Sequence, residues 1–225
     1  MKYLIVAAHP DDELLGAGAT IMRVQSEGNS VDLCIMCQKA EQRITDINDN
    51  DIVSETAYVC DKLAIGNLYT ADFPNLQMNL TPHIELVKFI EDAILTSEAN
   101  VIITHHPSDT NNDHFQTSLA CQEAVRICQR RNTQHKINEV WYMEIPSSTD
   151  WSLNTSTNRF NPNLFVEVQF SELKRKTELL SHYSGALRES PHPRSEKNIM
   201  GLASYRGGQS GYDYAEAFEC AFRKL

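Results

Sequence analysis

The chain opens with Lys2-Tyr-Leu-Ile-Val-Ala-Ala-His-Pro-Asp-Asp-Glu13, and this stretch decides the fold. Residues 2–8 are almost entirely apolar, which is typical of a strand buried on both faces. The polar cluster His9–Glu13 follows at once. Residues 13–26 then carry apolar side chains at helical spacing and stop at Gly28. The stretch therefore predicts a strand, a turn rich in imidazole and carboxylate groups, and a helix.

The alternation of strand and helix continues along the chain. Apolar runs predict further strands at residues 31–37, 101–104, 139–144 and 164–168. Helical spacing predicts helices over residues 51–63, 114–131, 171–183 and 196–205. This order predicts a Rossmann-like three-layer α/β fold with a mostly parallel sheet, in a single domain spanning residues 1–225.

Three other segments give more local expectations. Thr81-Pro82 predicts the start of a helix with the Thr81 hydroxyl as its N-cap, and this helix has an apolar stripe made of Ile84, Val87, Ile90, Ala93 and Ile94. Residues 147–157 are rich in Asn, Ser and Thr, and they predict a long loop. Residues 214–222 fit either a strand or a helix.

The charge of the chain is unevenly distributed. Residues 1–100 hold 16 acids and 6 bases, a net charge of −10, whereas residues 101–225 hold 14 of each. A field of this sign repels phosphate backbones, so it argues against general nucleic-acid binding and favours cations, including metal ions.

Targeting and cysteine usage give few further signals. No apolar run reaches the ~20 residues that a membrane span needs, and the apolar N-terminal stretch is too short for a signal peptide. The 6 cysteines are too few for a disulfide scaffold. Cys34 and Cys37 form a lone C-x-x-C inside an apolar run, which favours buried strand cysteines over a zinc or redox site. We expect a cytoplasmic protein with reduced thiols.

Two polar clusters follow two of the predicted strands. His9–Glu13 follows the first strand, and His105–His114 follows the strand at residues 101–104. Ligand sites of parallel sheets form at the carboxyl ends of strands, so the two clusters are expected to meet. Imidazole and carboxylate groups together are ligands that zinc accepts, and two His with one Asp leave a coordination position open for water.

The acids of the first cluster also have a plainer interpretation, as residues at the start of a helix. Asp11, Asp12 and Glu13 open a helix, where acids interact favourably with the helix dipole and can cap free N–H groups. That explanation accounts for the acids. It does not account for His9 or for the second cluster, so the pattern favours a metal site. Residue spacing alone leaves open whether Asp11 or Asp12 is the ligand.

The chain resembles the PIG-L (LmbE-like) family of zinc-dependent deacetylases. The resemblance is carried by His9-Pro-Asp-Asp-Glu13 with the following Leu-Leu-Gly-Ala-Gly, and it extends over nearly the whole chain through residues 107–114, 144–151, 191–195 and 214–218. It implies hydrolysis of the N-acetyl group of an N-acetylated sugar or sugar conjugate. It also implies one zinc held by His9, Asp12 and His114, with Asp11 as the general base that takes a proton from the zinc-bound water. The same ligand set suits Fe²⁺.

One position departs from the family pattern. Many members carry a His three residues before the last metal ligand, and here that residue is Asn111. An amide can donate a hydrogen bond to an oxyanion but cannot transfer a proton. Proton delivery to the leaving amine then falls to Asp11, acting first as base and then as acid, or to His182 at the end of a predicted helix.

The expected substrate contacts are three arginines. The resemblance places Arg43 in a loop where the family has a sugar-binding arginine, although a solvated loop charge explains it equally well. Arg194 and Arg206 lie beside Pro-His-Pro and Gly-Gly, in segments where arginine can hold a phosphate- or nucleotide-linked handle on the sugar. Three aromatic residues can stack on a sugar ring or simply pack: Trp151, Tyr183 and Tyr205.

Three alternative functions share parts of this pattern. A zinc amidase acting on a thiol or other conjugate keeps the same chemistry, and a catalytically silent metal-binding protein keeps only the metal. A nucleotide-binding module is disfavoured because Gly16-Ala-Gly18 lacks the third glycine of G-x-G-x-x-G and three acids occupy the phosphate turn. The sequence leaves the oligomeric state open, a homo-oligomer included.

Overall fold

A computed structural model describes residues 1–39, 49–131, 136–153 and 158–224 of the chain. Seven strands form one sheet in the order β3-β2-β1-β4-β5-β7-β6. The strands are β1 (Lys2–Ala7), β2 (Ser30–Ile35), β3 (Leu68–Thr70), β4 (Val101–His105), β5 (Glu139–Met143), β6 (Leu164–Glu167) and β7 (Ala215–Arg223). β1 to β5 pair in parallel, and β7 runs antiparallel to both β5 and β6. The predicted mostly parallel sheet is confirmed.

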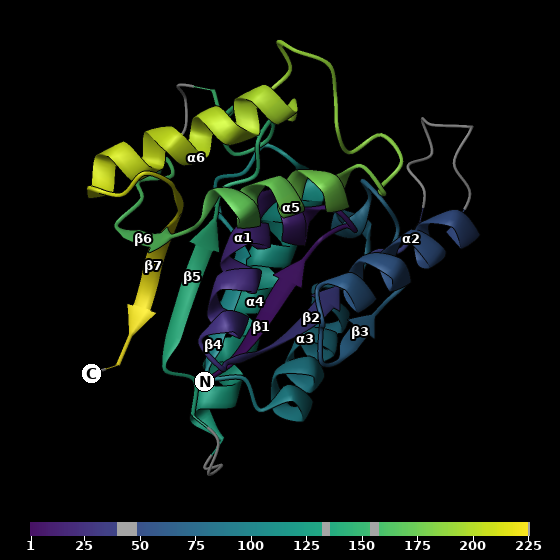
Figure 1. The fold of residues 1–225 in the computed structure, drawn as a ribbon. Helices are drawn as coiled ribbons and strands as arrows, with labels where there is room; N and C mark the ends of the chain where they lie inside the picture. Colours follow the sequence, from purple (N-terminus) through teal and green to yellow (C-terminus); the bar gives the residue numbers. More distant parts are fainter. Residues whose placement is uncertain (40–48, 132–135, 154–157, 225) are drawn as a thin grey trace.

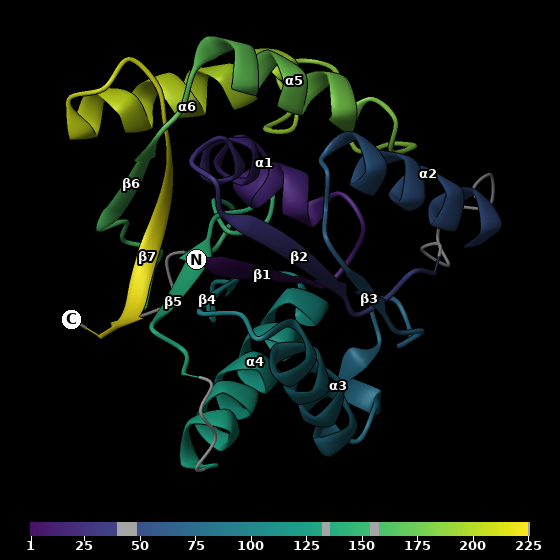
Figure 2. The same cartoon turned by 60° about the horizontal axis from the view of Figure 1, so that its bottom comes forward.

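Helices cover both faces of this sheet. They are α1 (Asp12–Ser26), α2 (Asp49–Lys62), α3 (His83–Ser97), α4 (Asn112–Arg130), α5 (Phe170–Leu180) and α6 (Glu196–Ser210), with a short 3₁₀ turn η1 (Met78–Leu80). Figures 1 and 2 show α3 and α4 on one face and α1, α2, α5 and α6 on the other. The three-layer α/β prediction is therefore confirmed. No helix in the described part of the chain is long and apolar enough to cross a membrane.

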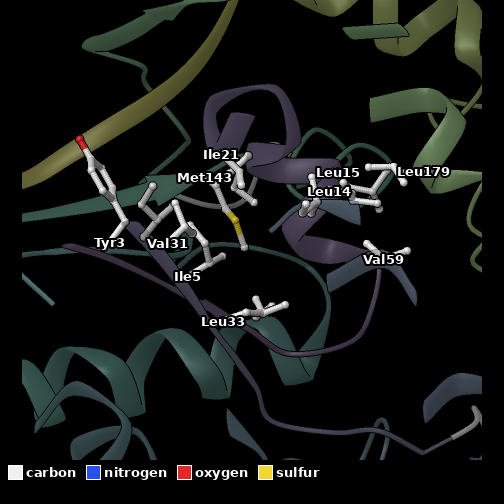
Figure 3. Packing of buried hydrophobic residues seen from close by; sticks show 14 of the residues in the cluster. Tyr3, Ile5, Leu14, Leu15, Ile21, Val31, Leu33, Val59, Met143 and Leu179 are labelled. Carbon is white, nitrogen blue, oxygen red and sulfur yellow. The ribbon is translucent and has the colours of Figure 1, made fainter. Parts of the chain in front are cut away.

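The central strands are apolar throughout because they are buried on both faces. In β1, Tyr3, Ile5 and Ala7 join the core under α1, α2 and α5, whereas Leu4 and Val6 join the core under α3 and α4. Figure 3 shows the first of these cores, in which side chains from β1, β2 and β5 meet those of the covering helices. Cys34 and Cys37 are buried in the second core as free thiols.

A glycine allows α1 to approach the sheet closely. A Cβ atom on Gly16 would lie 2.5 Å from the sulfur of Met143 in β5 and 2.9 Å from Cδ1 of Ile145. Such distances are well inside van der Waals contact, so a larger residue here would displace the buried side chains of Met143 and Ile145. Gly16 therefore serves helix–sheet packing, which accounts for this glycine without a phosphate-binding role.

Four local features differ from the expectations or resolve them. α3 begins at His83 with Pro82 as its N-cap residue and no side-chain cap, so the predicted Thr81 cap is wrong. Ile84 is 53% exposed, and Leu86 takes its place in the core. Residues 215–223 form a strand. β3 was not predicted, because three residues at a sheet edge carry too little pattern.

The topology places the two polar clusters together. The chain leaves β1 toward β2 and β3 on one side of the sheet, and later continues through β4 and β5 on the other side. β1 and β4 are neighbours, with Tyr3 opposite Val101 and Val6 opposite Thr104. This is the switch point of the sheet, and the loops that follow β1 and β4 open a crevice there.

Candidate metal centre

Three side chains converge at the carboxyl ends of β1 and β4. His9 follows β1, Asp12 lies in the first turn of α1, and His114 lies in the first turn of α4. One ligand atom from each lies within 4.8 Å of the others. Asp12 Oδ2 is 3.2 Å from His114 Nε2 and 3.4 Å from His9 Nδ1. The structure thus brings together the three residues that the sequence proposed as metal ligands.

Two of the buried polar atoms in this group have no hydrogen-bond partner. They are Asp12 Oδ1 and His114 Nε2, and both residues are about 1% exposed. Buried polar atoms are nearly always satisfied, so two unsatisfied atoms in neighbouring side chains call for an explanation. A cation bound between an imidazole nitrogen and a carboxylate oxygen would satisfy both. The residues present therefore fit a metal ion of the kind that accepts two His and one Asp.

Each imidazole of this group has a carboxylate on its other nitrogen. Asp113 Oδ2 lies 3.0 Å from His9 Nε2, and Asp109 Oδ2 lies 3.2 Å from His114 Nδ1. Such partners fix the tautomer and the ring orientation of metal-binding histidines. Asp113 also accepts hydrogen bonds from the backbone N–H groups of Leu76 at 2.5 Å and Met78 at 3.1 Å.

A second group, His105, Asp109 and His114, also has close ligand atoms. Two of its three residues already accept hydrogen bonds, however, although His105 Nδ1 has no hydrogen-bond partner among the described residues. Ala8 N–H donates to His105 Nε2 at 2.8 Å, and Thr149 Oγ1 donates to Asp109 Oδ2 at 2.7 Å. Burial, followed by the charge of His114, lowers the pKa of His105 to about 3. The neutral His105 ring stacks on His114 at 4.0 Å and supports it from behind. The first group is therefore the better candidate for metal binding.

Asp11 is held beside the three candidate ligands in a strained conformation. Its φ of 96° lies in the region that favours glycine. Glu13 Oε2 accepts from the Asp11 N–H at 3.1 Å, and Arg194 Nη1 donates to Asp11 Oδ2 at 2.9 Å. The side chain does not cap α1, so the helix-cap interpretation of Asp11 is wrong. Burial raises the pKa of Asp11 to about 6, although Arg194 opposes the rise.

The other acid of the motif, Glu13, is fully buried. Its Oε1 accepts a hydrogen bond from the Tyr183 hydroxyl at 2.8 Å, and its Oε2 accepts from the Asp11 backbone. Burial raises the pKa of Glu13 to about 8, and the Tyr183 hydrogen bond opposes the rise. Glu13 thus connects α1 and the start of the α5–α6 segment to the backbone of Asp11.

A cleft of about 180 Å³ opens over this group of residues. The side chains that line it come from both neighbouring loops, from α2 and from the segment between α5 and α6. They are His9, Pro10, Asp11, Asp12, Lys39, Ile52, Glu55, Asn75, Leu76, Asn111, His114, Tyr183, Ser184 and Arg194. Asn111 is the N-cap of α4, and its Oδ1 accepts from the Asp113 N–H at 2.9 Å. Its amide nitrogen is thereby left to donate elsewhere.

The other predicted site residues are placed as follows. Arg194 lines the cleft, and its Nε also donates to Pro146 O and Ser147 Oγ. Arg206 lies in a different hollow and binds both oxygens of Glu144, at 2.8 and 2.7 Å. His182 is exposed, is not among the cleft-lining residues, and packs against Tyr58 with ring centroids 4.4 Å apart. Arg43 lies outside the described residues.

Several residues of the site carried no assignment from the sequence. Asp109 and Asp113 lie in the second cluster, five and one positions before His114, and this proximity is the signal that could have found them. Of the three candidate aromatics, only Tyr183 lines the cleft. Leu76 and Asn75 come from the segment after β3, and no local pattern pointed to them.

Comparison with known proteins gives both a family and a fold. The family model for PIG-L, described as GlcNAc-PI de-N-acetylase, matches residues 4–125. A search of curated proteins found no match. The matched residues contain the first motif, the switch point of the sheet and His114.

Three solved structures illustrate how widely this fold is used. The N,N'-diacetylchitobiose deacetylase of Pyrococcus horikoshii has a TM-score of 0.77 and 16% identity, with 97% of this chain and 83% of that chain covered. The zinc-inhibited form of teicoplanin deacetylase Orf2 gives 0.75 and 15%, with coverage of 100% and 99%. GalB, the 4-carboxy-2-hydroxymuconate hydratase of Pseudomonas putida KT2440, gives 0.79 and 18%, with coverage of 100% and 98%.

These identities establish the fold alone, and that fold supports both deacetylases and a hydratase. Family membership rests on the match over residues 4–125, which covers more than half of the chain. It supports a hydrolase of the deacetylase type. This chain is a member of the PIG-L family.

Proposed function

We propose that this protein is a zinc-dependent N-deacetylase that hydrolyses the N-acetyl group of a sugar or sugar conjugate in the cleft over His9, Asp12 and His114. The observation that carries the proposal is the pair of unsatisfied buried atoms, Asp12 Oδ1 and His114 Nε2, in a cleft that the Arg194-paired carboxyl group of Asp11 also lines. A cation site next to a base is what amide hydrolysis by an activated water requires.

His9, Asp12 and His114 would hold the ion. When bound, zinc supplies a Lewis acid that polarises the amide carbonyl and lowers the pKa of water. The set of two His and one Asp also suits Fe²⁺, so zinc is the ion we propose and iron is the alternative. Asp109 and Asp113 contact the other ring nitrogens of His114 and His9, and would thereby orient the two rings for an ion.

Asp11 is the proposed general base. It lines the cleft, and its contacts with Arg194 and with the Glu13-bound backbone hold the carboxylate in place. Asp11 accepts a proton from the attacking water as the new C–O bond forms at the amide carbon. It then returns that proton to the nitrogen as the C–N bond breaks, which releases acetate and the free amine.

Stabilisation of the oxyanion and proton delivery to the leaving amine are assigned from the positions of the side chains. The amide nitrogen of Asn111 can donate to the developing oxyanion, since its oxygen is used to cap α4. His182, the second candidate for proton delivery, lies outside the set of cleft-lining residues. Asp11 is therefore the proposed proton donor as well as the base.

The cationic side chains near the cleft indicate where an anionic group of the substrate could bind. Arg194 is paired with Asp11, whereas the side chain of Lys39 has no ion-pair partner among the described residues. An anionic handle on the sugar, such as a phosphate or nucleotide, would meet Lys39. Arg206 is fully engaged by Glu144 and Gln209, which makes it a poor second contact for such a handle.

The test is acetate release by the purified protein before and after metal removal. N-acetylglucosamine, its phosphate and nucleotide conjugates, and amide conjugates of thiols form the panel. We expect acetate from an acetylated sugar, loss of that activity with a chelator, and recovery with added zinc. Cleavage of the thiol conjugates alone would favour the amidase alternative. Zinc binding without hydrolysis of any compound would favour a silent metal-binding protein.

A further inference from the structure

Asp109 sits behind His114 in a network that joins two loops. Its Oδ2 faces His114 Nδ1 at 3.2 Å and accepts from Thr149 Oγ1 at 2.7 Å. Its Oδ1 accepts from Ser148 Oγ and from the Asn111 N–H at 2.8 Å. The carboxylate is buried, with a residue exposure of 6%. Every oxygen of Asp109 is therefore committed to a donor within the protein.

The hydroxyl groups in this network are themselves fixed. The Ile145 N–H donates to Thr149 Oγ1 at 2.8 Å, and Thr110 Oγ1 donates to the Ser148 carbonyl at 2.9 Å. Ser148 and Thr149 follow β5, whereas Asp109 and Thr110 follow β4. The loop after β5 thereby fixes the carboxylate of Asp109, which in turn contacts the imidazole of His114.

The orientation of His114 follows from these contacts. In the neutral ring that binds a metal, a hydrogen bond from Nδ1–H to Asp109 leaves Nε2 unprotonated, with its lone pair directed toward Asp12. His114 Nε2 is one of the two unsatisfied atoms of the candidate ligand group. Without Asp109, the ring would be free to turn or to carry its proton on Nε2, and either change removes a ligand.

We propose that Asp109, braced by Ser148 and Thr149, is a positioning residue that selects Nε2 of His114 for the metal and thereby sets metal affinity. This inference rests on the proposed metal site. It differs from the proposed function in its readout, which is metal affinity and not hydrolysis. It also separates Asp109 from the metal ligands, even though Asp109 lies close enough to be counted among them.

The variants are chosen to distinguish positioning from ligation. Asp109→Asn keeps an acceptor oxygen toward His114 Nδ1, and its amide N–H can donate to Ser148 Oγ, but it cannot accept from the Asn111 N–H as Oδ1 does. Asp109→Ala removes both contacts. Asp12→Ala removes a proposed ligand. Glu216→Gln is the control, because it perturbs a buried carboxylate that binds Lys176 Nζ at 2.7 Å and the Thr20 N–H at 2.7 Å, among residues outside the cleft lining.

Zinc affinity is measured by competition with a chromophoric chelator, and Co²⁺ loading reports the coordination through its absorption bands. We expect Asp109→Ala to weaken zinc binding by roughly 10- to 100-fold and to alter the Co²⁺ bands, since outer partners of ligating histidines have effects of this size. Asp109→Asn should bind zinc more tightly than Asp109→Ala, because it keeps the acceptor for His114 Nδ1. Glu216→Gln should lower the melting temperature and leave both metal readouts unchanged.

Wild-type affinity in Asp109→Ala would overturn the inference. So would complete loss of metal binding equal to that of Asp12→Ala, because Asp109 would then be a ligand. A wild-type protein that binds no zinc would overturn both the inference and the proposed metal site. The expected order of affinities in a protein that releases no acetate would uphold the role of Asp109 and contradict only the proposed hydrolysis.

Discussion

Arg194 Nη1 lies 2.9 Å from Asp11 Oδ2, and this ion pair joins the α5–α6 segment to the turn after β1. The two side chains are 20% and 15% exposed, so the pair is largely shielded from water. The sequence placed Arg194 among the substrate contacts. The structure gives its guanidinium a carboxylate partner and two further acceptors, the Pro146 carbonyl and the Ser147 hydroxyl.

We expect the loss of the Arg194–Asp11 ion pair to lower turnover and not substrate binding. Arg194→Ala removes the group that positions the carboxylate of Asp11, and misplacement of a catalytic group costs on the order of 100-fold. We expect kcat to fall by about that factor with the metal content unchanged. Steady-state kinetics and metal analysis test this. An effect confined to KM for phosphorylated substrates would instead support the sugar-handle role.

Asp113 joins a proposed metal ligand, His9, to the chain segment at Leu76 and Met78 beside the cleft. Its carboxylate contacts His9 Nε2 and also accepts from the N–H groups of Leu76 and Met78. Asp113→Ala should weaken zinc binding by roughly 10- to 100-fold. It should also speed hydrogen exchange at the amides of Leu76 and Met78. Unchanged exchange at both amides would show that Asp113 does not hold this segment.

We expect the Tyr183 hydroxyl to contribute to the free energy of unfolding. Its hydroxyl donates to the buried Glu13 carboxyl at 2.8 Å, and Tyr183→Phe leaves that acceptor without its partner. An unsatisfied buried acceptor costs about 1–3 kcal/mol. Urea unfolding should show a loss in this range, with zinc affinity retained. A variant as stable as the wild type would mean that water replaces the hydroxyl.

Lys176 lies away from the candidate metal centre, and we expect its replacement to destabilise the protein more than Tyr183→Phe does. It is 5% exposed, and its Nζ contacts Glu216 at 2.7 Å and the Leu15 carbonyl at 2.9 Å. Lys176→Met leaves Glu216 as an unpaired buried charge, which costs about 3–5 kcal/mol. Thermal and urea unfolding measure the effect. A loss below about 1 kcal/mol would contradict the buried-pair interpretation, because only exposed pairs contribute so little.

Much of the fold could be predicted because local patterns decided it. β1, β2 and β4 are buried on both faces, so their apolar runs stand out from the sequence. β3 has three residues at an edge and carries no such run. The Thr81 cap failed because its hydroxyl does not bond the helix start, where Glu85 N–H donates instead to the Pro82 carbonyl.

In the candidate site, too, some residues could be predicted from the sequence and some contacts could not. His9, Asp12 and His114 could be grouped because parallel strands bring their carboxyl ends together, and β1 and β4 are neighbours. The pairing of Arg206 with Glu144 could not be foreseen, since it depends on how α6 packs near the end of β5. The Tyr183–Glu13 contact spans 170 positions of sequence, and no periodicity encodes such a pair.

The division of roles between Asp11 and Asp12 is the central claim, and one measurement tests it most directly. Zinc content and acetate release are determined together for the wild type, Asp11→Asn and Asp12→Asn. We predict that Asp11→Asn keeps its zinc and loses about 10²- to 10⁴-fold in kcat, the usual contribution of a general base. Asp12→Asn should lose the metal. An Asp11→Asn protein without zinc, or one that retains its activity, would contradict the account.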